Sequence, residues 1–237
     1  MNHVINVTRL HLNKPVVAFG VPLMIVGLVL VITWIIAAIL QRAGMDPLDP
    51  AYAEGARTGN QGMVWSLPGF LVYLGVQAVA TTFPFALALG TTRRAYVAGT
   101  AVANLIQAAY ITVIMTVLLG IELATDHWFF GAYALDTLLL GSGSFGVLIP
   151  TVFIAVFVFL SVGGAFGAVW VRFGSKGPTI LALALALVLV IALLILVPQF
   201  GEIIAGITRF RVALFGIAVA LVALVGTWFC MRRTAVR

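Results

Sequence analysis

Charged residues are scarce in this sequence. Of its 237 residues, 8% are Asp, Glu, Lys or Arg, while 63% are hydrophobic. A water-soluble domain needs about 25% charged residues to cover its surface. The deficit excludes a soluble globular protein, and the polar stretches are too short for a separate catalytic or nucleotide-binding domain. We therefore expect no enzymatic activity. The net charge of +6 is not gathered on one soluble face, so we expect no nucleic-acid partner.

Cysteine is nearly absent as well. The single Cys230 cannot form an intrachain disulfide. No group of His, Cys and Asp has the spacing of metal ligands, and we expect no cofactor in this chain. Residues 141–146, GSGSFG, fit the dinucleotide-binding pattern, but they precede an apolar run instead of joining a strand to a helix. Without that context the pattern does not indicate a nucleotide site.

Long apolar runs dominate what is present. Crossing the hydrocarbon core of a bilayer takes about 20 helical residues. The fifth run alternates as a strand would, but it is too long for one. A membrane barrel is excluded because its strands alternate polar and apolar positions. We therefore predict an all-α membrane protein with six transmembrane helices, at 16–40, 63–90, 98–123, 146–171, 178–200 and 212–231.

The distribution of charge predicts the orientation. If the N-terminus lies in the cytoplasm, the inner segments hold nine Lys or Arg residues and no acid, and the outer segments hold four Arg and all seven acids. Basic residues near span ends favour the cytoplasmic side. We expect both termini to be cytoplasmic, with 232–237 as a tail. Residues 1–15 indicate a short amphipathic helix along the inner interface, with a frayed tail as the alternative.

No Asp, Glu, Lys or Arg lies in the middle of a predicted span. Carriers coupled to ions or protons keep such residues at membrane depth. A channel filter would need a carbonyl-rich loop between spans, and none is evident. We therefore expect that any uphill transport draws its energy from another chain through the inner loops.

The turn between spans two and three carries the most specific pattern. Residues 81–100 read TTFPFALALGTTRRAYVAGT. Gly90 can end a helix in a left-handed conformation, which leaves Arg93 and Arg94 beside its negative end. Positive-inside anchoring alone would account for these two arginines. The pattern also resembles that of ABC exporter permeases of the second type, which have six spans and cytoplasmic termini. It is carried by Phe83, Pro84, Phe85, Ala86, Leu87, Leu89, Gly90, Arg93, Arg94, Tyr96, Gly99 and Thr100.

The resemblance implies a partner and a division of labour. In that family this turn docks into a cytosolic ATPase subunit, which binds ATP and Mg, and two permeases join two ATPases. It implies a cytosolic ABC ATPase as partner, and a second permease copy or a paralogue. The implied ATPase-coupling residues are Thr92, Arg93, Arg94, Ala95 and Tyr96, with Arg172 and Lys176 of the second inner loop as a smaller contact.

Polar and small residues within the spans form separate groups. Tyr73, Gln77 and Thr81 recur every four residues on one helix face. Because the resemblance puts helices two and five around a central cavity, these three are candidate cavity-lining residues, with packing against another helix as the alternative. Residues 180–197 carry no polar side chain, so such a cavity would suit a hydrophobic or amphipathic cargo. The candidate helix-packing residues are Asn104 and Gln107 in span three and Gly163 and Gly167 in span four.

Two outer segments complete the prediction. We interpret the aromatic residues of 124–145 as a belt at the membrane interface, with a substrate-contacting lip as the alternative. These residues are Trp128, Phe129, Phe130 and Tyr133. Residues 198–211 are the candidate for the short re-entrant helical pair that the family often has between spans five and six.

These observations together favour the permease subunit of an ATP-driven exporter. We expect it in a bacterial plasma (inner) membrane, surrounded by membrane lipids, with a drug, a peptide or a lipid-like molecule as cargo. The alternative is a non-transporting membrane scaffold or sensor that binds a cytosolic partner through its inner loops.

Overall fold

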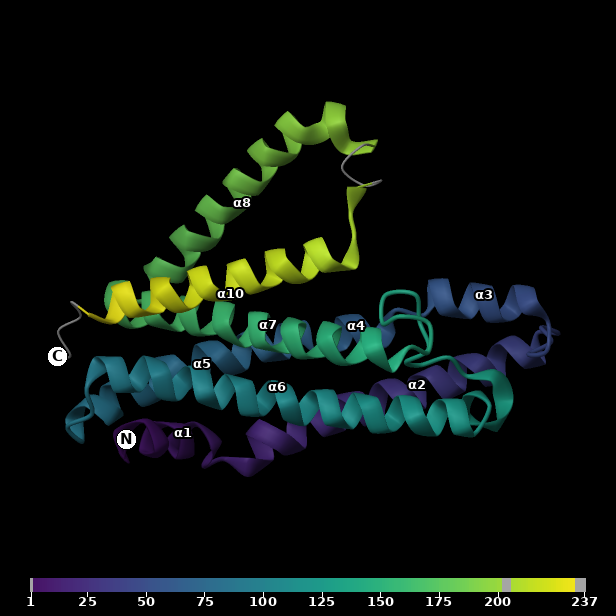
Figure 1. The fold of residues 1–237 in the computed structure, drawn as a ribbon, viewed down its shortest axis with the longest axis horizontal. Helices are drawn as coiled ribbons and strands as arrows, with labels where there is room; N and C mark the ends of the chain where they lie inside the picture. The colour runs from purple at the N-terminus through teal and green to yellow at the C-terminus, as the bar shows by residue number, and fades with distance from the viewer. Residues whose placement is uncertain (1, 202–205, 233–237) are drawn as a thin grey trace. The chain divides into compact units, whose positions relative to one another are not determined.

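The computed structural model describes residues 2–201 and 206–232, and the regular elements among them are helices (Figure 1). Six helical segments are long and apolar enough to cross a membrane: Val16–Arg42, Pro50–Ala88, Arg93–Ala124, Phe145–Phe173, Lys176–Gln199 and Arg209–Met231. The chain is therefore an all-α, multi-pass membrane protein, which confirms the fold class predicted from the apolar runs. The orientation of its termini stays a prediction.

Most helix bounds lie close to the predicted spans. A π-helical turn, Val16–Gly20, leads into α2, and a 3-10 turn, Val197–Gln199, follows α8. The other long helices begin or end within a few residues of the predicted spans. Their bounds are α2 Val21–Arg42, α6 Arg93–Ala124, α7 Phe145–Phe173, α8 Lys176–Leu196 and α10 Arg209–Met231.

The predicted second span, 63–90, is not one continuous helix. It is divided into α4, Gly62–Ser66, and α5, Pro68–Ala88. The break falls at Leu67, just before Pro68, which has no N–H to continue the hydrogen bonding of α4. The polar segment before it also contains a helix, α3, Pro50–Gly59, which we did not predict. Its signal was present: Asp49 caps the helix through a hydrogen bond from the amide of Ala51, and Pro50 occupies the first turn.

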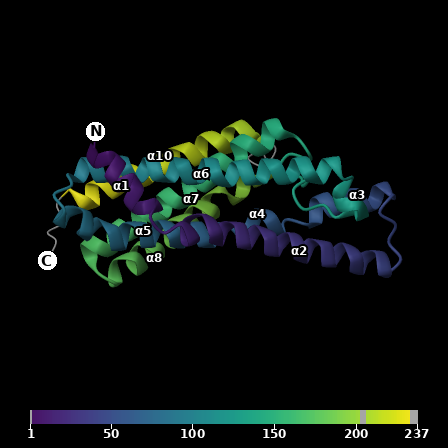
Figure 2. The same cartoon turned by 90° about the horizontal axis from the view of Figure 1, so that it is seen from below.

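The chain divides into two compact units. Unit 1 comprises residues 1–11, 72–102 and 158–237, and unit 2 comprises 12–71 and 103–157. In unit 1, α1, Asn2–Leu12, lies across the start of α6 (Figure 2). The predicted amphipathic helix therefore forms, and it packs on protein through its apolar side. The buried core of unit 1 is made of Val7, Val79, Phe83, Ala86, Tyr96, Ala168 and Met231.

Helices α5 and α7 approach closely within unit 1 where glycines face each other. A Cβ atom built on Gly163 would lie 2.2 Å from the carbonyl oxygen of Val72, and one on Gly75 would lie 2.4 Å from the carbonyl oxygen of Leu160. Gly167 continues the contact one turn later, against the backbone of Val76. Helices in a bilayer associate through such close backbone contact, because burial from lipid supplies no hydrophobic driving force.

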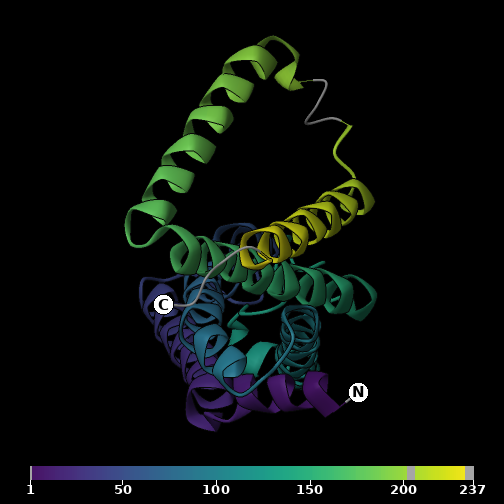
Figure 3. The same ribbon diagram turned by 90° about the vertical axis from the view of Figure 1, so that its left-hand side faces the viewer.

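Helix α8 contrasts with the rest of unit 1. It extends away from α7 and α10 (Figures 1 and 3), and none of the residues in its most apolar stretch is buried within the chain. The predicted re-entrant pair at 198–211 follows it. Residues 202–205 lie outside the described residues, as do 233–237 of the predicted tail. Of the remainder, Thr208 caps α10 by accepting a hydrogen bond from the amide of Arg211.

In unit 2, α2 and α6 are joined by hydrogen bonds at a proline. Pro22 has no N–H, so the carbonyl of Ala18 four residues earlier lacks its helical partner. The amide of Gln107 on α6 donates to that carbonyl instead. One turn further along α6, the hydroxyl of Tyr110 donates to the carbonyl of Phe19, 3.0 Å away, and the two rings meet edge to face.

Candidate functional site

The turn between α5 and α6 is tightly built. Gly90 has φ +80°, which confirms the left-handed cap expected from the sequence. The amides of Gly90 and Thr91 donate to the carbonyls of Leu87 and Ala86, a pattern that satisfies the last turn of α5. The hydroxyl of Thr92 then accepts from the amide of Ala95, 3.2 Å away, and so starts α6. The four residues between the helices therefore hold a defined conformation.

Both inner loops predicted from the sequence reach the last turn of α10. The guanidinium of Arg93 donates to the carbonyl of Arg232, and that of Arg172 donates to the carbonyl of Phe229, 3.2 Å away. Cations are favoured at this end of a helix, where carbonyls lack intrahelical partners. The two loops are thus fixed on one element. Arg94 and Lys176 are exposed beside them.

Tyr96 requires a correction. We expected it in the partner contact, but its side chain is 0% exposed, because it forms part of the core of unit 1. Its ring meets Phe83 edge to face at 5.1 Å, and its hydroxyl lies 2.7 Å from that of Thr82. Tyr96 holds α5 and α6 together and is not available to another chain. The residues of this segment that reach the surface are Thr92, Arg93, Arg94 and Ala95.

Helix α1 supports the start of α6. A Cβ atom on Gly99 would lie 2.6 Å from Cβ of Val7, so the two helices are in close contact. The hydroxyl of Thr8 donates to the carbonyl of Gly99, and Nε2 of His11 is hydrogen-bonded to the hydroxyl of Thr100 at 2.9 Å. Burial lowers the pKa of His11 to about 4, so the ring is neutral at physiological pH.

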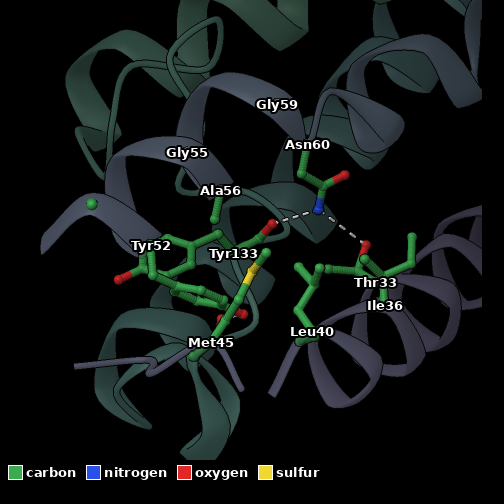
Figure 4. A pocket seen from close by; sticks show the side chains of 13 residues that line it. Thr33, Ile36, Leu40, Met45, Tyr52, Gly55, Ala56, Gly59, Asn60 and Tyr133 are labelled. Atoms are coloured by element: carbon green, nitrogen blue, oxygen red, sulfur yellow. Dashed lines mark hydrogen bonds between the residues drawn. The ribbon is translucent and has the colours of Figure 1, made fainter. Parts of the chain in front are cut away.

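The candidate cavity-lining residues lie on an exposed face of α5. Tyr73, Gln77 and Thr81 are all exposed, and the hydroxyl of Thr81 donates to the carbonyl of Gln77. None of the three lines the cavity shown in Figure 4, which lies in unit 2 between α2, α3 and the segment after α6. Their role in a cavity between two chains stays a prediction.

The candidate packing residues are all found in helix contacts or buried positions. Asn104 and Gln107 are 7% and 3% exposed, and Gln107 makes the bond to Ala18 described above. Gly163 and Gly167 lie against the backbone of α5.

The sequence analysis did not predict an ionic cluster in unit 2 that is centred on the buried side chain of Asp136. The carboxylate of Asp136, 1% exposed, accepts through Oδ2 from Nε and Nη2 of Arg57, at 3.0 and 2.8 Å, and is hydrogen-bonded to Nε2 of His127 at 3.0 Å. Glu122 supports it by accepting from the amides of Ala134, Leu135 and Asp136. Arg57 and Asp136 are 79 residues apart in segments without periodicity, so no sequence pattern linked them.

The partners within this cluster shift two pKa values in opposite directions. Desolvation alone would raise the pKa of Asp136, but the hydrogen bonds and charges of His127 and Arg57 outweigh it and lower that pKa. The hydrogen bond to Asp136 raises the pKa of His127, against the effect of desolvation. Opposite charges in contact favour the charged forms of both groups. The cluster therefore joins α3 to the segment after α6 through charges that stabilise one another.

The aromatic residues of this segment do not form one belt, which corrects the prediction. Tyr133 is buried and stacks on His127, with ring centroids 3.9 Å apart, while the guanidinium of Arg57 lies over its ring. Trp128 contacts Trp34 of α2. Only Phe129 is strongly exposed, at 86%. Trp128 and Tyr133 are therefore held by contacts within the chain.

The backbone that carries His127 has an unusual conformation. Residues 126–129 have φ between 47° and 66°, although none of them is glycine. A left-handed conformation costs roughly 1–2 kcal/mol for each such residue. The contacts of His127 with Asp136 and of Trp128 with Trp34 hold this turn in place.

No family model, curated protein or solved structure matches the chain.

Proposed function

We propose that this chain is the permease subunit of an ATP-driven ABC exporter in a bacterial plasma membrane, which moves a hydrophobic or amphipathic cargo. The observation that carries the proposal is the turn between α5 and α6. Its sequence resembles the coupling segment of such permeases, and its two ends are fixed by the cap at Gly90 and the cap at Thr92. A rigid turn can transmit a partner's movement to the helices on either side.

The surroundings of the turn support a basic contact with an acidic partner surface. Arg94 and Lys176 are exposed, and Arg93 and Arg172 fasten their loops to α10. Arginine binds carboxylates with a planar, two-pronged geometry that lysine cannot reproduce. Arg94 is therefore the residue we assign to the ATPase, with Arg93 in a positioning role.

Exposed surfaces of unit 1 support an assembly with a second permease. Helix α8 has no buried residue in its most apolar stretch, and the face of α5 that carries Tyr73, Gln77 and Thr81 is also uncovered. A polar stripe on a membrane helix is costly against lipid and is satisfied by another helix or by a water-filled cavity. A second copy of this chain or a paralogue would cover α8 and would provide the helix or the cavity that the polar stripe of α5 faces.

The proposal is tested by purification of the tagged chain from its native membrane. A cytosolic ATPase carrying a G-x-x-x-x-G-K-[ST] motif is expected to co-purify. Arg94→Ala should then reduce the co-purified ATPase and uncouple hydrolysis from transport, because loss of a buried charged contact costs about 2–5 kcal/mol. Arg9→Ala is the matched control, since it removes an exposed base of α1 outside the turn.

Conservative replacement separates partner binding from anchoring. Arg94→Lys keeps the charge, so topology should be unchanged, and a cysteine placed at Ser175 should stay unlabelled by impermeant thiol reagents in sealed cells. If Arg94→Lys and Arg94→Ala both bind the ATPase and transport like the parent, the coupling assignment is wrong. Co-purification of a cytosolic protein without a nucleotide-binding motif would favour the scaffold alternative.

A further inference from the structure

A cavity of about 470 Å³ lies in unit 2, between α2, α3 and the segment after α6 (Figure 4). Sites that hold small molecules typically measure about 300–1,000 Å³. The second half of α2 forms one wall, and α3 forms another with a run of small residues. Its lining consists of Thr33, Ile36, Ala37, Leu40, Met45, Ala51, Tyr52, Gly55, Ala56, Gly59, Asn60, Gly131 and Tyr133.

Three of the four polar side chains of this lining, those of Thr33, Tyr52 and Asn60, are hydrogen-bonded to the protein itself. The amide of Asn60 donates to the hydroxyl of Thr33 and to the carbonyl of Tyr133, at 3.3 and 2.6 Å. The hydroxyl of Tyr52 donates to the carbonyl of Gly131 at 3.0 Å. None of the thirteen lining residues is charged. Water is a poor occupant of a space most of whose polar side chains already have partners, whereas a hydrocarbon group needs no hydrogen bond.

The cavity adjoins the exposed apolar surface of α2. Ile36 lines it and is also 48% exposed, and Ile32, Ile35 and Ile39 beside it on the same helix are exposed to a similar degree. Because α2 belongs to a membrane-crossing segment, these isoleucines face lipid chains. A lipid chain in contact with Ile36, near the outer end of α2, therefore lies beside the cavity and can enter it.

The walls are held in place by contacts outside the cavity. Arg57 on α3 is paired with Asp136, which also binds His127, so the outer wall is fastened to the segment after α6. The bonds of Tyr52 and Asn60 join the same two segments. A cavity formed before its ligand arrives binds at a lower ordering cost than one that must open.

From the hydrogen-bonded polar side chains, the apolar lining and the adjoining lipid-facing isoleucines, we infer that this cavity holds an acyl chain of a membrane lipid. The site is independent of the proposed coupling turn and does not require transport. The lipid chain fills the space between α2 and α3 and adds packing contacts along the wall that Arg57 fastens.

The glycines of α3 offer a sharp test. A Cβ atom on Gly55, which lines the cavity, would have no heavy atom within 4 Å, so Gly55→Leu introduces a side chain without a clash at Cβ. Leucine also favours a helix over glycine. Gly69→Leu is the control, because Gly69 on α5 is equally open but does not line the cavity. Ala56→Leu is a second filling variant.

The probe is phosphatidylcholine with a diazirine near the end of one acyl chain, in vesicles that contain the purified protein. After irradiation, adducts are mapped by mass spectrometry. We expect adducts at residues 51–59 and 131–133 in the parent and in Gly69→Leu. Filling the space of several methylene groups should reduce them on the order of ten-fold in Gly55→Leu and Ala56→Leu.

Adducts on residues outside the cavity provide the internal reference, because neither filling variant changes the surface there. They should be unchanged, and the thermal midpoint of Gly55→Leu should equal or exceed that of the parent. Absence of cavity adducts in the parent would overturn the inference. Equal cavity labelling in the parent and in both filled variants would overturn it as well.

Discussion

The crossing of α5 and α7 at Gly163 allows a prediction with a control in the next residue. A methyl group at Gly163 would lie 2.2 Å from the carbonyl oxygen of Val72 and 3.0 Å from Cα of Gly75, whereas ordinary contact begins at 3.4 Å. The obstacle is backbone and cannot rotate aside. Gly163→Ala therefore forces the two helices apart by about 1 Å at their closest point.

The expected loss of stability in Gly163→Ala follows from the contacts between α5 and α7 that are pushed apart. Overpacking of this kind costs about 1–3 kcal/mol. The better helix propensity of alanine offsets up to about 1 kcal/mol of it. Gly164→Ala makes the same chemical change one residue later, where the added Cβ would lie 3.5 Å from Cγ2 of Val79, an ordinary contact. We expect that variant to be as stable as the parent or slightly more stable.

Thermal unfolding in detergent, followed by tryptophan fluorescence and by protection from protease, measures the difference. The midpoint of Gly163→Ala should fall by several degrees, and that of Gly164→Ala should not fall. Equal midpoints for the two variants would refute the close approach of α5 and α7. A lower midpoint for Gly164→Ala alone would show that Gly164, and not Gly163, faces α5.

Two further predictions concern unit 2. A protonated His127 stabilises the fold fully below its ordinary pKa of 6.5, and this contribution is lost as pH rises through its raised folded-state pKa, so the unfolding midpoint of the parent should decline over that window. His127→Gln keeps a donor without a charge and should remove this decline; an unchanged pH profile would contradict the pairing with Asp136. Gln107→Leu leaves the carbonyl of Ala18 without a partner and should lower the free energy of unfolding by about 1–3 kcal/mol. Adding Pro22→Ala restores an N–H for that carbonyl, and double-mutant analysis of the unfolding midpoints should show that it recovers part of the loss.

The number and approximate limits of the membrane helices could be predicted from the sequence alone. A run of about 20 apolar residues can satisfy its backbone in lipid only as a helix, so composition determines the structure of each run. Helix caps can also be predicted from the sequence, because residues such as Gly90 and Thr92 act on the backbone of their immediate neighbours. The signal for α3, Asp49 followed by Pro50, was local too, although its short polar sequence concealed it.

Contacts between distant segments were decided by the tertiary structure. The resemblance places Tyr96 in the partner contact, whereas the structure buries it against Phe83. Hydrophobic periodicity could not correct this, because it does not tell which neighbour a helix face meets in a chain that is apolar all round. The pairing of Arg57 with Asp136 joins residues 79 positions apart, and both lie in segments where no repeat constrains direction. Their attraction becomes strong only after folding removes Asp136 from water, because the interaction between two charges grows as the surroundings become less polar. That dependence on burial is a property of the folded chain, which the order of its residues does not display.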